Sequence, residues 1–246
     1  MTAAPVEREA SMSSERLAGV RAILAERAPG AGASLSEHDS LRVLAAWGLE
    51  TVRLGFAPSR ADALGRADAF GFPLVLKGLV PDVAHKTEHG LVHPWLRSSA
   101  ELGRALGELP ASCGGFLLEE QVRGIRELVL GIVRDPTFGA SVLVAMGGVH
   151  SELIADTSFL LAPVGVAKAR AALGRLRCAR MFGAYRGEAP AKLELLIAMM
   201  QQLGELALAC PEIRELDINP VILRRDGTPV ACSALCVLST ASSPLA

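Results

Sequence analysis

Residues 72–90 read Phe72-Pro-Leu-Val-Leu-Lys77-Gly-Leu-Val-Pro-Asp82-Val-Ala-His85-Lys86-Thr87-Glu88-His89-Gly90, and they hold two of the four lysines in a chain of 246 residues. A lysine ammonium is a compact, mobile charge that can follow a phosphate group. The apolar residues around Lys77 predict a strand over residues 74–79, and Lys86 opens a polar loop. Because both amines can converge on a polyphosphate, this stretch predicts a nucleotide site.

A second informative stretch lies downstream and reads Glu215-Leu-Asp217-Ile-Asn219-Pro-Val-Ile-Leu223. Apolar and polar residues alternate from residue 213 to residue 218, which predicts a strand with Asp217 and Asn219 on one face. Carboxylate and amide oxygens are ligands that Mg²⁺ prefers. A magnesium site would complement a phosphate site.

These two stretches and the motifs between them resemble the ATP-grasp beta subunit of NDP-forming acyl-CoA synthetases. The likeness is strongest to the ADP-forming acetyl-CoA synthetases and weaker to succinyl-CoA synthetase beta. It runs from about Leu35 to Leu238, and the order and spacing of the motifs over this length carry it. The matching positions are Lys77, Pro81-Asp82, His85-Lys86, Glu119-Glu120, Gly124, Glu127, Arg134 to Gly139, Gly147-Gly148, Glu152, Asp156, Arg186-Gly187 and Leu216 to Pro220.

The resemblance implies an α+β (α/β) fold of the two-lobed ATP-grasp type, with a nucleotide between the lobes. We expect a tail and linker over residues 1–34, an N-terminal lobe with its leading helix over 35–121, and a C-terminal lobe over 122–246. The implied reaction converts acyl-CoA, ADP and phosphate to a carboxylic acid, ATP and CoA, or the reverse, with ATP or ADP and Mg²⁺ as cofactors. The implied partner is a separate CoA-binding alpha subunit in a hetero-oligomer, since the sequence contains no glycine-rich dinucleotide fingerprint.

The resemblance also implies roles for individual residues. His85 is the candidate catalytic residue, because a neutral imidazole can accept a phosphoryl group near pH 7 and Lys86 can neutralise the incoming charge. Residues 119–122 would form the hinge that reads adenine. The implied nucleotide-binding residues are Lys77, Lys86, Glu119, Glu120, Gln121, Val122, Glu127, Gly147, Gly148 and Arg186, and the implied metal ligands are Asp217, Asn219 and Ser233.

Several of these residues also suit a plainer structural role. Lys77 is otherwise a strand-end lysine reaching solvent, and His85 is otherwise a loop histidine that forms only hydrogen bonds. The hinge carboxylates and Glu127 are otherwise solvated side chains. Gly147-Gly148 suits a plain hairpin turn as well as an approach to phosphate, and Arg186 suits either a phosphate or a carboxylate.

The chain departs from the family pattern at three places. Ser233 stands where relatives carry a metal-binding aspartate, and a hydroxyl brings no charge to Mg²⁺. Leu91 replaces a glycine after the phosphate loop, where its side chain could crowd the phosphates, and His93-Pro94 lies where relatives form a strand. The hinge reads Glu-Glu in place of Gln-Glu. The changes at residues 91–94 are consistent with a subclass that acts on a different acyl substrate. Ser233 and Leu91 also motivate an alternative function, a degenerate ATP-grasp domain with a regulatory or structural role in a CoA-ligase complex. A further alternative is an ATP-grasp ligase that forms an acyl phosphate, in which His85 would have no role.

Composition narrows the function classes further. A net charge of −1 and 4% aromatic residues disfavour nucleic-acid binding. No apolar run is long enough for a membrane span, and the charged first 20 residues do not suit a secretory signal, so we expect a cytoplasmic protein with no membrane partner. The five cysteines show no paired spacing and are interpreted as buried, small apolar residues rather than as a disulfide framework or a zinc site.

Periodicity and turn residues predict the order of the elements. A tail with a short helix and a linker precedes a helix that begins with the capping box Ser34-Leu-Ser-Glu37 and ends at Gly48. Further helices are expected over 60–70, after Ser98, and over about 166–177 and 191–209. Strands are expected over 74–79, 116–122, 127–133, 141–145, 152–155, 159–161, 213–218, 221–224 and 229–238, with a turn at Asp226-Gly227.

Overall fold

The computed structural model describes residues 5–26, 34–80, 89–148 and 156–239. Helices and antiparallel sheets share the chain, which confirms the predicted α+β class. Internal contacts divide it into a larger unit of Met1–Leu35, Asp39–Thr51 and Gly124–Ala246, and a smaller unit of Ser36–His38 and Val52–Arg123. The sequence-based boundaries after residues 34 and 121 therefore stay a prediction, and the contact grouping places residues 39–51 with the larger unit.

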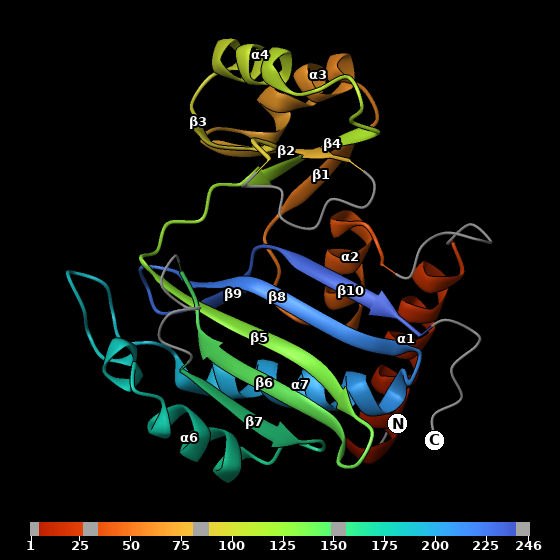
Figure 1. The fold of residues 1–246 in the computed structure, drawn as a ribbon, viewed down its shortest axis with the longest axis vertical. Coiled ribbons are helices and arrows are strands. Elements are labelled where there is room, and N and C mark those ends of the chain that lie inside the picture. The colour runs from red at the N-terminus through yellow and green to blue at the C-terminus, as the bar shows by residue number, and fades with distance from the viewer. Residues whose placement is uncertain (1–4, 27–33, 81–88, 149–155, 240–246) are drawn as a thin grey trace. The chain divides into compact units, whose positions relative to one another are not determined.

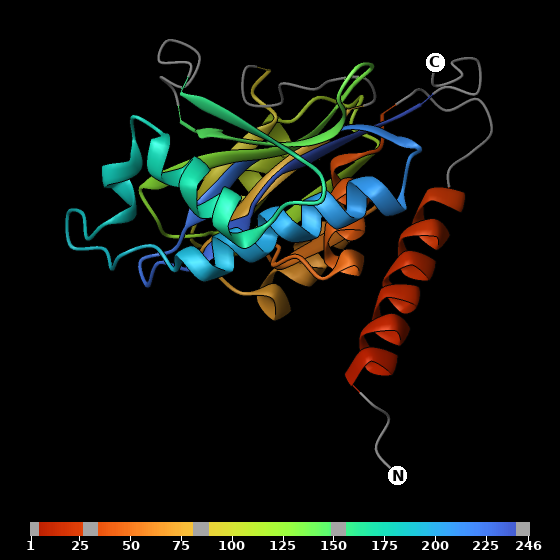
Figure 2. The ribbon, with the colours of Figure 1, turned by 90° about the horizontal axis from the view of Figure 1, so that it is seen from below.

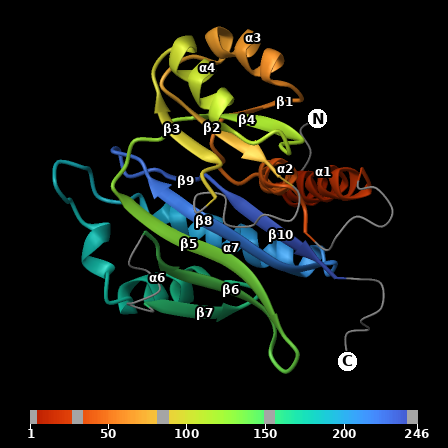
Figure 3. The same cartoon turned by 45° about the horizontal axis from the view of Figure 1, so that its top comes forward.

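The smaller unit is a four-stranded antiparallel sheet with two helices on one face (Figure 1). Its strand order is β1-β4-β2-β3, so β2 and β4 are central and β3 is an edge (Figure 3). The strands are β1 (Leu54–Ala57), β2 (Leu74–Leu79), β3 (Val92–Leu96) and β4 (Gly115–Glu120). The helices are α3 (Arg60–Phe70) and α4 (Ser99–Glu108).

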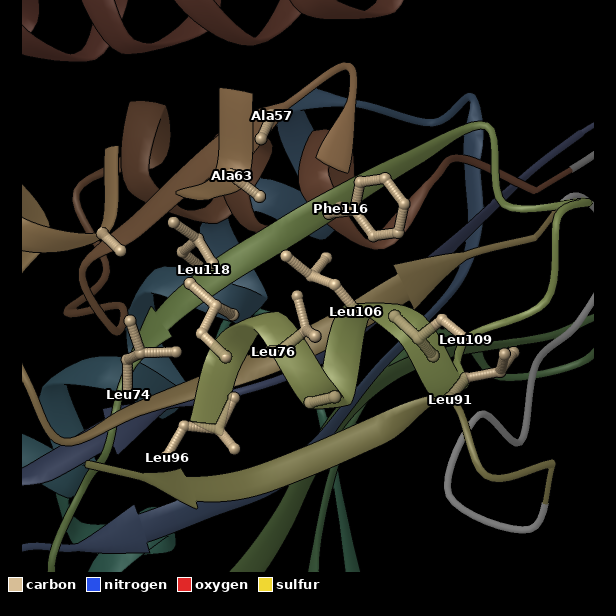
Figure 4. Packing of buried hydrophobic residues seen from close by; sticks show 13 residues of the cluster. Ala57, Ala63, Leu74, Leu76, Leu91, Leu96, Leu106, Leu109, Phe116 and Leu118 are labelled. Carbon is tan, nitrogen blue, oxygen red and sulfur yellow. The ribbon is translucent and has the colours of Figure 1, made fainter. Parts of the chain in front are cut away.

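A leucine-rich core joins these helices to the sheet (Figure 4). Leu74 and Leu76 on β2 and Leu118 on β4 meet Leu106 of α4, and all four are almost completely buried. Because side chains alternate along a strand, this packing turns Lys77 and Glu119 toward the other face of the sheet.

Local capping explains where the helices of this unit begin and end. Ser59 accepts a hydrogen bond from the Asp62 amide at the start of α3, and Ser98 caps α4 in the same way through the Glu101 amide. Helix α3 ends at Gly71, whose φ of 91° suits glycine. The structure confirms both predicted helices and the predicted strand over 74–79.

The larger unit contains a six-stranded antiparallel sheet of order β10-β8-β5-β6-β7, with β9 also paired to β8. Helices α6 and α7 cover one face of it (Figure 2). The strands are β5 (Arg126–Asp135), β6 (Gly139–Met146), β7 (Thr157–Leu161), β8 (Ile213–Leu223), β9 (Pro229–Ala231) and β10 (Ala234–Leu238). The helices are α1 (Pro5–Ala25), α2 (Glu37–Trp47), whose first two residues belong to the smaller unit, α6 (Val166–Arg175), the short 3-10 helix η1 (Ala179–Phe182) and α7 (Leu193–Ala209).

Several predicted boundaries were wrong. The first helix, α1, has 21 residues and is not short. Strand β8 runs unbroken through Pro220, which has no backbone amide hydrogen to donate. The register against β5 shifts between Leu128 and Leu130, and this irregularity accommodates the proline. The strand predicted over 229–238 divides into β9 and β10 opposite that irregularity. The strand predicted over residues 152–155 lies outside the described residues.

Helix α2 also begins later than the capping box predicted. Its first residue is Glu37, whose carboxylate pairs with Lys77. Its predicted end is confirmed at Gly48, where φ is 95°. The predicted turn at Asp226-Gly227 is also confirmed, with φ of 82° at Gly227 and a hydrogen bond from the Arg224 amide to the Thr228 carbonyl.

The fold accommodates the departures at Leu91 and Pro94. The sequence suggested that the Leu91 side chain could crowd the phosphates, but Leu91 is only 2% exposed and packs in the core of the smaller unit. Residues 92–96 form β3 despite Pro94, because β3 is an edge strand with a bulge opposite Leu74–Leu76. The strand that His93-Pro94 put in doubt is therefore present.

No helix among the described residues is long and apolar enough to cross a membrane. All five cysteines are free thiols. Cys210, Cys232 and Cys236 are buried, as predicted, whereas Cys113 and Cys178 are partly exposed, so the prediction of burial was wrong for these two.

Candidate functional site

Among the described residues, Lys77 groups with two buried glutamates within the smaller unit. Its Nζ is 2.7 Å from Oε1 of Glu37, at the start of α2, and 2.8 Å from Oε2 of Glu119, on β4. The side chain of Lys77 is 10% exposed, and those of the two glutamates are 2% exposed. Lys77 is therefore not a strand-end lysine that reaches into solvent.

The charge of Lys77 is fixed by these neighbours. Burial alone would lower its pKa, but the Coulombic attraction of Glu119 and Glu37 outweighs burial and holds the pKa above its ordinary value. Lys77 is consequently an ammonium throughout the physiological range. A lysine kept charged inside the protein is suited to binding an anion such as a phosphate.

The predicted hinge begins at the end of β4. The Glu120 amide donates to the Arg53 carbonyl and the Gln121 amide to the Pro73 carbonyl, so both amides are used within the smaller unit. The Gln121 side chain accepts a hydrogen bond from the Trp95 amide at 2.7 Å and donates one to the Val122 carbonyl at 3.3 Å. The adenine-reading role of residues 119–122 stays a prediction, and the structure shows the side chain of Glu119 turned to Lys77.

A cavity of about 540 Å³ lies within the larger unit. Glu127 on β5, the diglycine Gly147-Gly148 after β6 and residues around η1 all line it. Its lining consists of Ile125, Arg126, Glu127, Met146, Gly147, Gly148, Cys178, Arg180, Met181 and Tyr185. The sequence placed Glu127 and the diglycine in the candidate site, and the structure brings them together.

The diglycine is required by the close approach of two strands. The Gly147 amide donates to the Glu127 carbonyl at 2.9 Å, and a Cβ on Gly147 would lie 2.9 Å from the Glu127 carbonyl carbon. Gly148 has φ of 86°, which disfavours any residue with a side chain. Burial raises the pKa of the Glu127 carboxyl above its ordinary value. A half-buried carboxylate facing a cavity is a typical acceptor for ligand hydroxyl groups.

A buried ion pair at the cavity, between Arg126 and Glu188, holds the loop that carries η1. Arg126 Nε lies 3.1 Å from Glu188 Oε2, and their side chains are 1% and 5% exposed. Arg126 also donates to the carbonyls of Met181, Gly183 and Ala189. The other oxygen of Glu188 accepts from the Ile125 amide at 3.1 Å. This part of the cavity lining therefore depends on one guanidinium, which uses four of its five N–H donors.

Arg186 lies in the tight turn between Tyr185 and Glu188. Its φ of 46° and the φ of 83° at Gly187 place both central residues of the turn in the left-handed region. The guanidinium stacks over the Tyr185 ring, with Cζ 5.2 Å from the ring centroid. The side chain is exposed, so its phosphate or carboxylate role stays a prediction.

The predicted metal ligands share one region of the large sheet. Asp217 and Asn219 alternate with buried Leu216 and Ile218, so both project from the exposed face of β8. Ser233 lies on the neighbouring segment, where its carbonyl accepts from the Asn219 amide at 3.1 Å. Among the described residues no cluster of three His, Cys, Asp or Glu side chains forms a metal cage. One carboxylate, one amide and one hydroxyl fit a Mg²⁺ ion that takes its other ligands from water and phosphates.

A family model described as an ATP-grasp domain matches residues 27–238. The chain belongs to the ATP-grasp family. It is 28% identical to acetate–CoA ligase [ADP-forming] I subunit beta of Pyrococcus furiosus over 91% of this chain and 100% of that subunit. It is 33% identical to acetate–CoA ligase [ADP-forming] I of Archaeoglobus fulgidus over 78% of this chain, which spans only 29% of that ligase.

Solved structures of the ATP-grasp family include one with a similar fold from Candidatus Korarchaeum cryptofilum. This dinucleotide-forming acetyl-coenzyme A synthetase 1 is in complex with coenzyme A and Mg-AMPPCP, with its phosphohistidine segment pointing towards the nucleotide-binding site. The TM-score is 0.78 with 28% identity over 89% of this chain and 100% of that chain. The predicted resemblance and the ATP-grasp fold are confirmed.

Other predicted ATP-grasp residues fall outside the described part of the chain. His85 and Lys86 are among them, as are Pro81, Asp82 and Glu152. Sequence reasoning also missed some residues of the site. Glu37 was interpreted only as a helix cap, and neither Arg126 nor Glu188 was predicted to form an ion pair. No local signal marks these pairs, because their partners are 40 and 62 residues away in the sequence.

Proposed function

We propose that this chain is the nucleotide-binding beta subunit of an ADP-forming acid–CoA ligase. The enzyme would convert acyl-CoA, ADP and phosphate to a carboxylic acid, ATP and CoA, or run in reverse. The observation that carries the proposal is the match over the full length of a separate beta subunit with that activity in its name. The chain spans under a third of the Archaeoglobus ligase. A CoA-binding alpha subunit in a hetero-oligomer is part of the proposal, because the Pyrococcus relative is named as a subunit beta.

The cofactors of the proposal are ATP or ADP and Mg²⁺. The Korarchaeum relative with Mg-AMPPCP supports both. In this chain Lys77 supplies a buried, permanently charged amine for the phosphates. Glu127 offers a half-buried carboxylate that can accept hydrogen bonds from the ribose hydroxyls, and the diglycine keeps the space beside it open. Asp217, with Asn219 and Ser233, would hold Mg²⁺, which neutralises phosphate charge when bound.

His85 is the proposed phosphoryl carrier. The phosphorus–nitrogen bond of a phosphohistidine on the partner breaks as a new one forms to the imidazole of His85, and that bond then breaks as a terminal phosphate oxygen of ADP takes the phosphoryl group. Lys86 would balance the added negative charge. The phosphohistidine segment seen in the Korarchaeum relative supports a relay of this kind. We place the protein in the cytoplasm, where its proposed substrates occur.

A degenerate, non-catalytic ATP-grasp domain is the second candidate, and Ser233 is the residue behind it. The departures at Leu91 and Pro94 no longer support this candidate, since Leu91 packs in the core and β3 forms a strand. Similarity to several named ligases favours the catalytic proposal over this candidate.

The test begins with calorimetric titration of the purified chain with ADP and ATP, each with and without Mg²⁺. We expect magnesium-dependent binding with a Kd on the order of micromolar. Turnover is then measured with a CoA-binding subunit for His85→Ala and for His89→Ala, which removes an exposed histidine close by in the sequence. His85→Ala should abolish turnover and leave nucleotide binding, and His89→Ala should change neither. Absence of nucleotide binding with and without the partner would refute the function, and full turnover of His85→Ala would refute the relay.

A further inference from the structure

The charge around the Lys77 amine is unusual for a phosphate site. An ammonium group donates three hydrogen bonds. Two carboxylates from separate elements, Glu37 on α2 and Glu119 on β4, lie within 2.8 Å of it. The lysine thus already binds two anionic groups at positions where a phosphate oxygen could bind.

A phosphate that reaches this amine meets two obstacles. Carboxylates already take two of the three donor positions of the amine, and both carboxylates repel the charge of the phosphate. Repulsion is strong here because all three side chains are almost fully removed from water. If the phosphate shared the amine with both carboxylates, three anions would lie close together in a region of low dielectric constant.

The two carboxylates differ in how they are held. Glu119 is on a central strand next to β2, where Val75 and not Lys77 is its direct partner, so it reaches Lys77 diagonally. It is also the first residue of the predicted hinge over residues 119–122, while Glu37 begins a helix. Glu119 is therefore the carboxylate that belongs to the segment that would meet a nucleotide.

We propose that Glu119 is an affinity-setting residue whose carboxylate competes with nucleotide phosphates for Lys77. Glu37 positions the amine, and Glu119 gives up its hydrogen bond to Lys77 when a phosphate binds. This inference rests on the proposed nucleotide-binding function. It predicts that removing the charge of Glu119 while keeping its shape strengthens the binding of phosphate-bearing ligands only.

The experiment compares Glu119→Gln with the wild-type chain by calorimetric titration of ADP and of adenosine, which has no phosphate. We expect ADP to bind about tenfold more tightly, because a charged hydrogen bond no longer has to be given up, and adenosine affinity to stay unchanged. Glu108→Gln is the matched control, since Glu108 is an exposed carboxylate on α4 in the same unit. It should leave both affinities unchanged.

Thermal unfolding of the same variants separates the competing role from a structural one. A lower Tm for Glu119→Gln with unchanged ADP affinity would mean that the three charges only support the fold, and would overturn the inference. An equal gain for ADP and adenosine would also overturn it, because the effect would then not act through phosphate. If the wild type binds ADP and the variant binds it no better, the inference fails while the proposed function stands. If no variant binds ADP even with the partner subunit, both fail.

Discussion

Glu188→Ala tests whether the buried ion pair with Arg126 holds the cavity wall. The substitution removes the carboxylate that lies 3.1 Å from Arg126 Nε and accepts from the Ile125 amide. Arg126 keeps its three carbonyl acceptors, but its charge remains buried, with 1% of the side chain exposed. Breaking a buried pair by removing one partner costs about 3–5 kcal/mol. For a chain of this length that cost lowers Tm by roughly 6–20 °C.

The assay is thermal and urea unfolding of Glu188→Ala beside Glu194→Ala. Glu194 pairs with Arg170 on the surface, with 74% and 49% of the two side chains exposed, so its removal should cost less than about 1 kcal/mol. We also expect Glu188→Ala to weaken ADP binding, because the loop with Met181 and Tyr185 loses its anchor beside the cavity. Equal losses of stability in the two variants would refute the argument that breaking the Arg126 pair is costly because the pair is buried.

Two further predictions concern charge at the candidate site. Because burial raises the pKa of Glu127, the folded state binds its proton more tightly than the unfolded state, and ionised Glu127 destabilises the fold above the raised pKa. Glu127→Gln should therefore raise Tm at pH 7 by about 1–2 °C, a small gain because the group is half-exposed, and the gain should vanish near pH 4; a gain equal at both pH values would contradict this. Ser233→Asp should increase the affinity for Mg²⁺-nucleotide about tenfold, measured by titration, since it adds an anionic oxygen beside Asn219, whereas Ser233→Asn should not. Unchanged affinity in Ser233→Asp would mean that other groups hold the metal.

Local structure was predictable where neighbouring residues decide it. Helix α3 and strand β2 match the sequence prediction residue for residue, because a glycine stop ends α3 and a run of apolar residues defines β2. The strand through Pro220 was not predictable. Its continuity depends on a register shift in β5, which lies some 90 residues earlier in the chain.

The candidate site was predictable in its residues but not in its contacts. The lysine, the glutamate on β5 and the diglycine were all found from the sequence, and the last two proved to line one cavity. The partners of Lys77 were missed, because Glu37 looks like a helix cap and Glu119 like a hinge residue. A sequence motif shows which residue types recur, whereas the burial that decides what a charge contacts emerges only when distant strands and helices pack together.

Two buried cations show how packing separates a structural role from one that suits ligand binding. Arg126 donates to three backbone carbonyls as well as to Glu188, and carbonyls cannot move away without moving the chain that carries them. Lys77 is held by two side-chain carboxylates, which can rotate about their own bonds. Replacing a hydrogen-bond acceptor by a phosphate oxygen therefore costs much free energy at Arg126 and less at Lys77. This difference in the kind of acceptor, more than burial or charge, makes Lys77 the cation suited to bind and release a nucleotide.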